Sequence, residues 1–430
     1  MENKRKYDFL VGWTNICRFI LSAVFIFSGF VKANDLHGTE YKIQDYLLAF
    51  GLNDIIPSYL PFLLSLILAI VEFCVGVYLF FGIRRRTSTT MALLMMGFMT
   101  PLTLWLAVTD KVLDCGCFGD VIILSNWETF WKNIIFLIAA VSIFKWKAKI
   151  KPIITSRFDW LVGLYTFIYI LYFSLYCYRE LPLLDFRPYH ISANIRNQME
   201  VPKDKKPTVY DTKFILEKNG KKKEFTLEDY PDSTWTFIDS KTVIKERGYE
   251  PPIKDFFIES FEDGEDITAD ILDKDDYTFL LIAPQLAKAD DSSIDLINEL
   301  YDYALDNKYQ FYCITSSSAN DIEKWKISTG AEYPFAIADE TMLKTMIRSN
   351  PGVILLKKGT IINKWSVNNL PNEYQLTDEL PNISLGYINE KTFIHKIFLA
   401  FGWFVMPLML FSVIDIAWET YKERRKKLKK

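Results

Sequence analysis

Six runs of apolar residues, each long enough to cross a bilayer as a helix, mark this chain. Short polar stretches separate most of them, but a long mixed stretch, Arg179–Lys391, precedes the last. The pattern predicts a helical membrane bundle with one large soluble insertion. No small-residue cleavage site follows the first run, so we interpret it as a retained anchor. The runs lie near Trp13–Val31, Tyr59–Phe81, Thr89–Val108, Trp127–Phe144, Asp159–Tyr178 and Phe393–Ile414.

Lys and Arg collect in four stretches that all fall on one side of the membrane if the six runs are spans. Such residues favour the cytoplasmic side, so we expect both termini in the cytoplasm and residues 179–391 outside it. The basic residues are Lys4, Arg5 and Lys6, then Arg84, Arg85 and Arg86, then Lys145, Lys147, Lys149, Lys151 and Arg157, and finally Arg424, Arg425, Lys426, Lys427, Lys429 and Lys430.

Within the insertion, apolar strands alternate with helical spacing from Tyr277 onward, which predicts an α/β layer. Before it, the prolines of Leu181–Asn194 predict a connector without a helix. Two short strands around Asn219-Gly220 predict a hairpin over Phe214–Phe225. The later predicted strands are Tyr277–Ala283, Gln310–Thr315, Phe335–Ala338, Gly352–Lys357 and Ile361–Trp365, and the predicted helices are Ser292–Asp306, Asn320–Thr329 and Glu340–Ile347.

A further helix is predicted between the first two apolar runs, on the outer side. There Tyr41, Ile43, Tyr46, Leu47 and Phe50 recur at helical spacing. We expect an amphipathic helix that lies on the outer membrane surface, near the loop after the third run.

Composition supports a membrane part joined to a soluble part. Of the 430 residues, 50% are hydrophobic, yet 24% are charged. The net charge of −3 argues against nucleic acid as a partner, and the lipid bilayer is the first partner expected. Six cysteines are too few for a disulfide scaffold.

The loop after the third apolar run, Leu113–Asp120, holds the main candidate chemistry. Cys115 and Cys117 are separated only by Gly116, whose freedom lets the backbone bend sharply. Two thiols this close can exchange disulfides, since the small ring of a Cys-x-Cys disulfide is strained and therefore labile. A static disulfide or plain thiols are the alternatives. A metal site is disfavoured, because none of the three histidines has ligand spacing to the pair.

Other thiols and charges are weaker candidates. Cys177, at the outer end of the fifth run, is either a resolving thiol for the pair or a packing residue. Arg18 and Glu72 lie within spans one and two, where charge is expensive unless it is paired. The two could approach each other and form a proton or quinone site. The alternative, slightly favoured, is a structural pair or an Arg18 side chain that snorkels to the surface.

The acidic neighbour of the thiol pair, Asp114, disfavours a thiolate, so another group must lower the thiol pKa. The sequence does not identify that group, and Arg187 and His37 are the candidates considered.

Spans one to four resemble the DoxX-like and MauE-like redox-associated membrane proteins over Thr14–Phe144. The resemblance rests on Phe27-Ser28-Gly29-Phe30-Val31-Lys32, on Glu72 and on Asp114-Cys115-Gly116-Cys117-Phe118-Gly119. It implies a four-helix bundle in the bacterial inner membrane that helps to form or transfer disulfides in exported proteins. A related bundle type passes electrons to quinone, which makes quinone the candidate cofactor.

The insertion resembles the thioredoxin fold over Pro251–Trp365, with a lead-in like that of TlpA-type proteins. In that fold a cis-proline begins the strand that here follows Asn350-Pro351. The resemblance implies partner binding beside Asn350 and Pro351, or docking on the bundle. The family's Cys-x-x-Cys is missing, because Ala283–Asp290 contains no cysteine.

Two functional hypotheses follow. The first is a thiol–disulfide oxidoreductase that acts on exported or periplasmic proteins through Cys115 and Cys117. The second is a non-enzymatic membrane scaffold or envelope-complex subunit whose outer domain binds a protein. The segments expected are a four-span bundle (1–150), a fifth span (151–180), a connector and hairpin region (181–250), a thioredoxin-like domain (251–390), and a sixth span with a basic tail (391–430).

Overall fold

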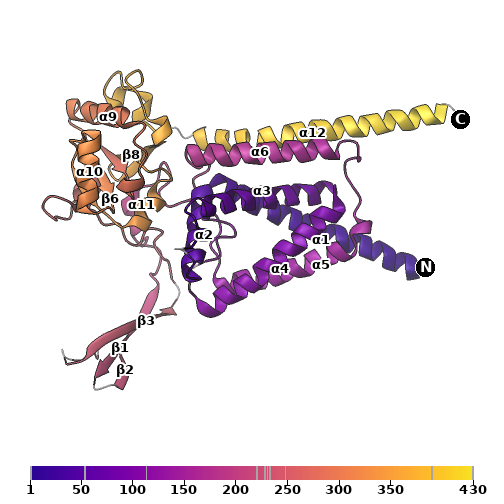
Figure 1. Ribbon diagram of the computed structural model, residues 1–430, viewed down its shortest axis with the longest axis horizontal. Helices are drawn as coiled ribbons and strands as arrows, with labels where there is room; N and C mark the ends of the chain where they lie inside the picture. The colour runs from indigo at the N-terminus through magenta and orange to yellow at the C-terminus, as the bar shows by residue number, and fades with distance from the viewer. Residues whose placement is uncertain are drawn as a thin grey trace.

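The computed structural model contains a membrane-type helical bundle and an α/β region that extends beyond one end of it (Figure 1). It describes residues 2–428 except 53–54, 113, 219–220, 227–228, 230, 232–233, 247 and 389–390. All six predicted spans are confirmed as helices long and apolar enough to cross a membrane. They are α1 (Glu2–Asn34), α3 (Leu60–Phe81), α4 (Arg85–Thr109), α5 (Asn126–Lys145), α6 (Asp159–Arg179) and α12 (Lys391–Leu428).

Helices α1 and α3 approach each other closely in the bundle. A Cβ atom added to Gly29 would lie 2.5 Å from the backbone nitrogen of Phe73, and one added to Gly76 would lie 2.6 Å from that of Ile26. Small residues at such crossings let two membrane helices pack backbone to backbone. The contact lies near the C-terminal end of α1. Three residues after Gly29, Lys32 reaches the loop that holds Cys115 and Cys117, called the cysteine loop below.

The helix predicted between the first two spans is confirmed as α2, which spans Leu36–Ala49. It begins five residues before Tyr41, because the Asp35 side chain accepts a hydrogen bond from the Gly38 N–H and caps a new helix one residue after α1 ends. The α/β region, residues 195–388, is called the outer region below. In Figure 1, α2 lies across the end of the bundle that faces this region.

The outer region is built on a six-stranded sheet with the order β4-β7-β6-β5-β8-β9. Strands β5, β6 and β7 are parallel, while β4, β8 and β9 pair antiparallel with their neighbours. The sequence predicted five of these strands to within one residue at each end. The bounds are β4 (Glu259–Ser260), β5 (Tyr277–Ile282), β6 (Gln310–Thr315), β7 (Phe335–Ile337), β8 (Gly352–Lys357) and β9 (Thr360–Ser366).

Helices cover both faces of this sheet, because alternate residues of the central strands point to opposite sides. Phe279 and Leu281 pack with α9 and α10, whereas Leu280 and Ile282 pack with α8 and α11. The helices are α7 (Ile195–Met199), α8 (Thr268–Leu272), α9 (Ile294–Asp306), α10 (Ala319–Thr329) and α11 (Glu340–Met346), and short 3₁₀ helices lie at Lys147–Lys149, Leu286–Lys288, Val367–Asn369, Leu380–Asn382 and Ser384–Gly386.

A second sheet, ordered β2-β1-β3, projects away from the outer region as an arm (Figure 1). Its strands are β1 (Val209–Lys218), β2 (Lys221–Phe225) and β3 (Thr236–Glu246). The predicted hairpin is confirmed, since Lys218 pairs with Lys221 and Phe214 with Phe225. Its turn residues Asn219 and Gly220 lie outside the described residues.

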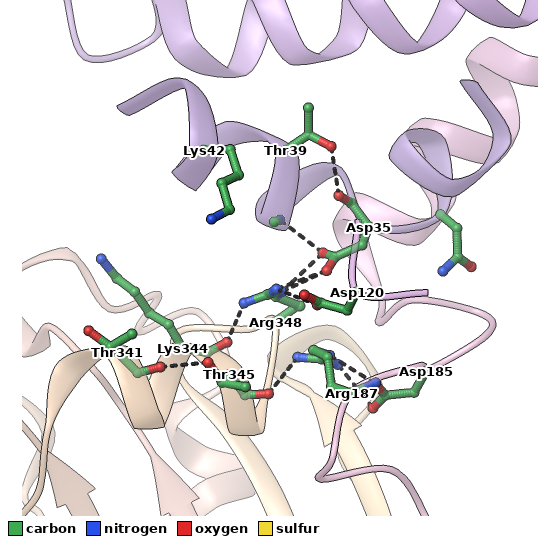
Figure 2. A network of polar contacts seen from close by, with 12 residues as sticks. Asp35, Thr39, Lys42, Asp120, Asp185, Arg187, Thr341, Lys344, Thr345 and Arg348 are labelled. Carbon is green, nitrogen blue, oxygen red and sulfur yellow. Dashed lines mark hydrogen bonds and ion pairs between the residues drawn. The ribbon is translucent and has the colours of Figure 1, made fainter. Parts of the chain in front are cut away.

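Arg348, just after α11, ties the outer region to the bundle (Figure 2). Its guanidinium donates to both carboxylate oxygens of Asp35, at 3.0 Å from Nε to Oδ1 and 2.9 Å from Nη2 to Oδ2. The Nη2 atom also lies 3.6 Å from Asp120, at the end of the cysteine loop. The Arg348 side chain is only 7% exposed, so this ion pair is shielded from water.

The connector after α6 adds a second set of ties. It contains no helix before Asn194, as predicted. Asp185 pairs with Lys364 of β9 and with Arg187, both at 2.8 Å, and Arg187 donates to the Thr345 carbonyl of α11. The Asn34 amide exchanges two hydrogen bonds with the backbone of Leu184. The end of α1 is thereby joined to the connector, and the connector to the sheet.

Replacement of Arg348 by Met is expected to loosen the outer region from the bundle. The change leaves Asp35 half-buried without its guanidinium, and loss of one partner of a shielded ion pair costs about 3 kcal/mol. Amide hydrogen exchange in α11 and around Asp35 should therefore accelerate. The matched control is Arg196→Met, whose pair with Asp273 is exposed and contributes at most about 1 kcal/mol. Equal exchange in the two variants would contradict this account of the docking.

Candidate functional site

The cysteine loop is closed at its base by the start of α5. Ser125 and Glu128 form a capping box that begins this helix. The Asn126 amide donates to the Val112 carbonyl and to the Asp110 carboxylate, both at 3.0 Å. Leu113 lies outside the described residues, and the loop is described from Asp114 to Leu124.

The two thiols lie side by side on this loop. Their Sγ atoms are 2.6 Å apart, close enough for one thiol to donate to the other and for a disulfide of about 2.05 Å to form with little movement. Gly116 between them has a φ of +68°, a conformation that other residues adopt only with strain. The sharp bend that brings the sulfurs together therefore depends on glycine.

Both cysteine carbonyls are held by side chains from neighbouring helices. The Tyr46 hydroxyl of α2 donates to the Cys115 carbonyl at 3.1 Å. The Ser28 hydroxyl and the Lys32 ammonium of α1 donate to the Cys117 carbonyl at 2.7 and 3.1 Å. The loop is thus fixed from two sides, and the sulfurs have a defined position before any partner arrives.

Asp114 supports the bend and is itself neutralised. One of its carboxylate oxygens accepts from the Gly116 N–H at 2.8 Å, and the other pairs with the Lys42 ammonium of α2 at 2.8 Å. Its negative charge therefore opposes a neighbouring thiolate less than the sequence suggested.

Glu72 pairs with Lys32, so the possible approach of Glu72 to Arg18 is not what the structure shows. Lys32 Nζ lies 2.8 Å from Glu72 Oε2, and both side chains are at most 7% exposed. Arg18 instead donates to the Lys151 carbonyl at 2.7 Å, at the other end of α1. Fourteen residues of helix separate Arg18 from Lys32, which is about 20 Å. Arg18 is thus bound to the loop between spans four and five.

The two thiols differ in exposure and in charge state. Cys115 is buried against Leu106 and Val112, whereas Cys117 is partly exposed. The hydrogen bond between the sulfurs lowers the pKa of Cys117 to about 7, and the Lys132 and Lys32 ammonium groups act in the same direction against burial. The same bond, together with burial, raises the pKa of Cys115. Of the two thiols, Cys117 is therefore the more readily ionised.

A small recess and a larger cavity adjoin the cysteine loop. A recess of about 10 Å³, room for one water molecule, lies against both cysteines and is lined also by Phe118, Ile122, Thr129 and Lys132. A second cavity, of about 280 Å³, also reaches Gly116. Its walls come from the loop, from α2 and from α11 with Arg348, as the labelled side chains in Figure 2 show.

The structure does not bring the remaining sequence candidates to the thiol pair. Cys177 is 1% exposed and packs in a separate cluster with Ala33 and Leu184. Arg187 is bound to Asp185, and His37 stacks on Tyr178 with ring centroids 4.1 Å apart. Neither is the cation that lowers the pKa of Cys117. Among the described residues, no group of three or more His, Cys, Asp or Glu side chains has the geometry of a metal site.

Asn350 and Pro351 are joined by a cis peptide bond and lie just before β8, an internal strand of the sheet. Pro351 is buried. The Asn350 amide donates to the Gln285 carbonyl at 2.9 Å, at the position where the sequence lacks the Cys-x-x-Cys. Their role in partner binding stays a prediction.

Sequence reasoning missed the side chains that hold the loop: Ser28, Lys32, Lys42, Tyr46 and Lys132. Two signals were present. Tyr46 lies on the apolar side of the predicted amphipathic helix, and Lys32 ends the first apolar run only four residues after Ser28. A lysine at that depth requires a buried acid, and Glu72 is the acid of the neighbouring span.

The part of the chain that carries this site is similar to a known protein family. Residues 210–247, in the projecting sheet, match a family described as a domain of unknown function, DUF8463. No curated protein and no solved structure matches the chain. Residues 10–145, which hold α1 to α5, the cysteine loop and its supporting side chains, match the family described as methylamine utilisation protein MauE.

Proposed function

We propose that this protein is a membrane thiol–disulfide exchange protein that acts through Cys115 and Cys117. One observation carries the proposal: two thiols held 2.6 Å apart on a fixed loop, one of them partly exposed beside two ammonium groups. Structural cysteines are buried and inert, whereas exchanging ones are partly exposed in electropositive surroundings. Similarity to MauE agrees with a membrane protein in a role related to redox chemistry or methylamine utilisation.

The exchange divides into two steps. The Cys117 thiolate attacks a partner disulfide, forming a mixed disulfide and releasing one partner sulfur as a thiolate. Cys115 then gives up its proton and attacks the Cys117 sulfur, which releases the second partner sulfur. Two electrons pass from the loop to the partner, and the loop ends as the Cys115–Cys117 disulfide. The reverse sequence oxidises a partner dithiol with the same atoms.

We place the protein in a bacterial inner membrane with both termini cytoplasmic and residues 179–391 periplasmic. The four basic stretches support this orientation, since they fall on one side of the six spans. In Figure 1 both termini lie at the end of the bundle opposite the outer region. The thiol pair then faces the compartment in which disulfides persist.

We further propose that the outer region is a thioredoxin-like domain that positions a protein partner without exchanging thiols. The parallel β7-β6-β5 strands, the antiparallel β8-β9 hairpin and the cis-proline before β8 support the fold. The only cysteine after Cys177 is Cys313, which is 0% exposed, so this region offers no accessible thiol.

That missing thiol also favours a second candidate function, a membrane scaffold in which the loop is a static clip. Under it, the docking through Arg348 would be the main role of the outer region. The two candidates differ in whether the loop changes its redox state.

In membranes, the variant Cys115→Ser is expected to accumulate a mixed disulfide with a partner protein, whereas Cys117→Ser is not. Cys117 can attack, but without Cys115 nothing resolves the product. The measurement is a mobility shift on a non-reducing gel, followed by mass spectrometry of the trapped species. Cys177→Ser and Cys313→Ser are the matched controls and should trap nothing.

Equal trapping by both single variants would contradict the roles assigned to the two thiols. Exchange itself would be refuted, in favour of the scaffold, if neither variant traps a partner and the wild-type pair keeps one redox state through a pulse of mild reductant.

Alkylation of Cys117 in the reduced protein should depend on pH with a midpoint near 7, the value to which its pKa is lowered. Only the thiolate reacts, so the rate is lost as the pH falls through that midpoint and reaches its plateau above it. The measurement is the rate of iodoacetamide labelling at Cys117, read by peptide mass spectrometry. In denaturant the midpoint should move to about 8.5. A folded-state midpoint at 8.5 or above would contradict the assignment.

A further inference from the structure

The Lys32 ammonium directs its three N–H groups at three acceptors. They are Ser28 Oγ at 2.6 Å, Glu72 Oε2 at 2.8 Å and the Cys117 carbonyl at 3.1 Å. All of these side chains are buried inside the bundle. The ammonium is thus saturated and cannot move without breaking contact with α1, α3 or the cysteine loop.

A need for mechanical support does not account for this pair. Ser28 already donates to the same Cys117 carbonyl at 2.7 Å, so a neutral side chain supplies the hydrogen bond. Buried ions carry a large desolvation penalty, and apolar residues in place of a buried ion pair are often as stable or more so. Lys32 differs from Ser28 in that it adds a positive charge beside the thiols.

Charges face Cys117 from each element packed around the loop. Lys32 of α1 and Lys132 of α5 are cationic, and the ammonium of Lys132 lies 4.0 Å from the ring centroid of Phe118, the next residue. Glu72 of α3 is anionic and acts on Cys117 from behind Lys32. Asp114 on the loop is paired with Lys42 of α2, Tyr46 of α2 donates to the Cys115 carbonyl, and the Cys115 thiol adjoins Cys117. Lys32 contacts the Cys117 carbonyl, whereas Glu72 contacts Lys32.

We propose that the Lys32–Glu72 pair controls the charge of the Cys117 sulfur from within the bundle. The Lys32 ammonium stabilises the thiolate, and the Glu72 carboxylate limits that stabilisation. Both are positioning residues, since neither contacts the reacting sulfur. The inference rests on the proposed function for its purpose, because exchange chemistry is what makes use of a thiolate.

The two members of the pair therefore act with opposite signs. Lys32→Met removes the cation and leaves the acid, so the thiolate loses stabilisation. Glu72→Gln removes the acid but keeps an acceptor for Lys32, so the thiolate gains stabilisation. A purely structural role predicts that both changes loosen the loop and shift Cys117 in the same direction.

The experiment measures iodoacetamide labelling of Cys117 against pH in full-length Cys115→Ser protein, with and without each change. At pH 6.5 the rate is expected to fall about tenfold in Lys32→Met and to rise about threefold in Glu72→Gln. Ser28→Ala is the matched control, because it removes a hydrogen bond to the Cys117 carbonyl without changing charge. Its shift should be smaller than either of the others.

Shifts of the same sign in both variants, or no shift in either, would overturn the inference. If Lys32→Met does not fold, Glu72→Gln alone decides: a faster rate at pH 6.5 supports the inference, and an equal or slower rate overturns it. The labelling needs no partner protein. A failure of the proposed function would instead appear as absent partner trapping with these opposite shifts intact.

Discussion

An ammonium and a carboxylate inside a membrane bundle are stable only as partners, so Lys32 and Glu72 fix where α1 and α3 meet. The close backbone contact at Gly29 and Gly76 gives the pair its register. Lys32 also binds the Cys117 carbonyl. The position of the thiols therefore depends on how α1 and α3 pack against each other. Lys32 thus couples the backbone position of Cys117 to the contact between α1 and α3.

The outer region contacts the loop through Asp120. Arg348 reaches Asp120 at the end of the loop and Asp35 at the start of α2, and α2 carries the Lys42 and Tyr46 contacts to the other end of the same loop. The larger cavity meets the backbone of Gly116, whereas both cysteines line the small recess. Under the proposed function, the outer region acts on the loop through its backbone and charges and leaves the recess beside the sulfurs to the partner.

Elements fixed by local pattern were predictable from the sequence. The six spans follow from the length of their apolar runs, and strands such as Gln310–Thr315 and Gly352–Lys357 agree to the residue, because buried strands are continuous apolar runs bounded by turn residues. The start of α2 was missed, since a single cap at Asp35 decides it. The partner of Glu72 was missed for another reason. Helical periodicity gives the face of each span but not the depth at which two spans meet, and that depth, set by Gly29 and Gly76, selects Lys32 over Arg18.

The thiol pair shows the same limit. Its spacing alone predicts two sulfurs within reach of each other, and that is what the structure contains. Spacing treats the two cysteines as equivalent, however, and the fold does not. Cys115 packs against Leu106 and Val112, while Cys117 borders Lys132 and the carbonyl contact of Lys32. The difference arises partly from α4 and α5, which flank the loop, and partly from α1, which is distant in sequence and meets the loop only in the bundle. Under the proposed function, the direction of attack, with Cys117 first and Cys115 second, is thus set by the packed spans and not by the motif.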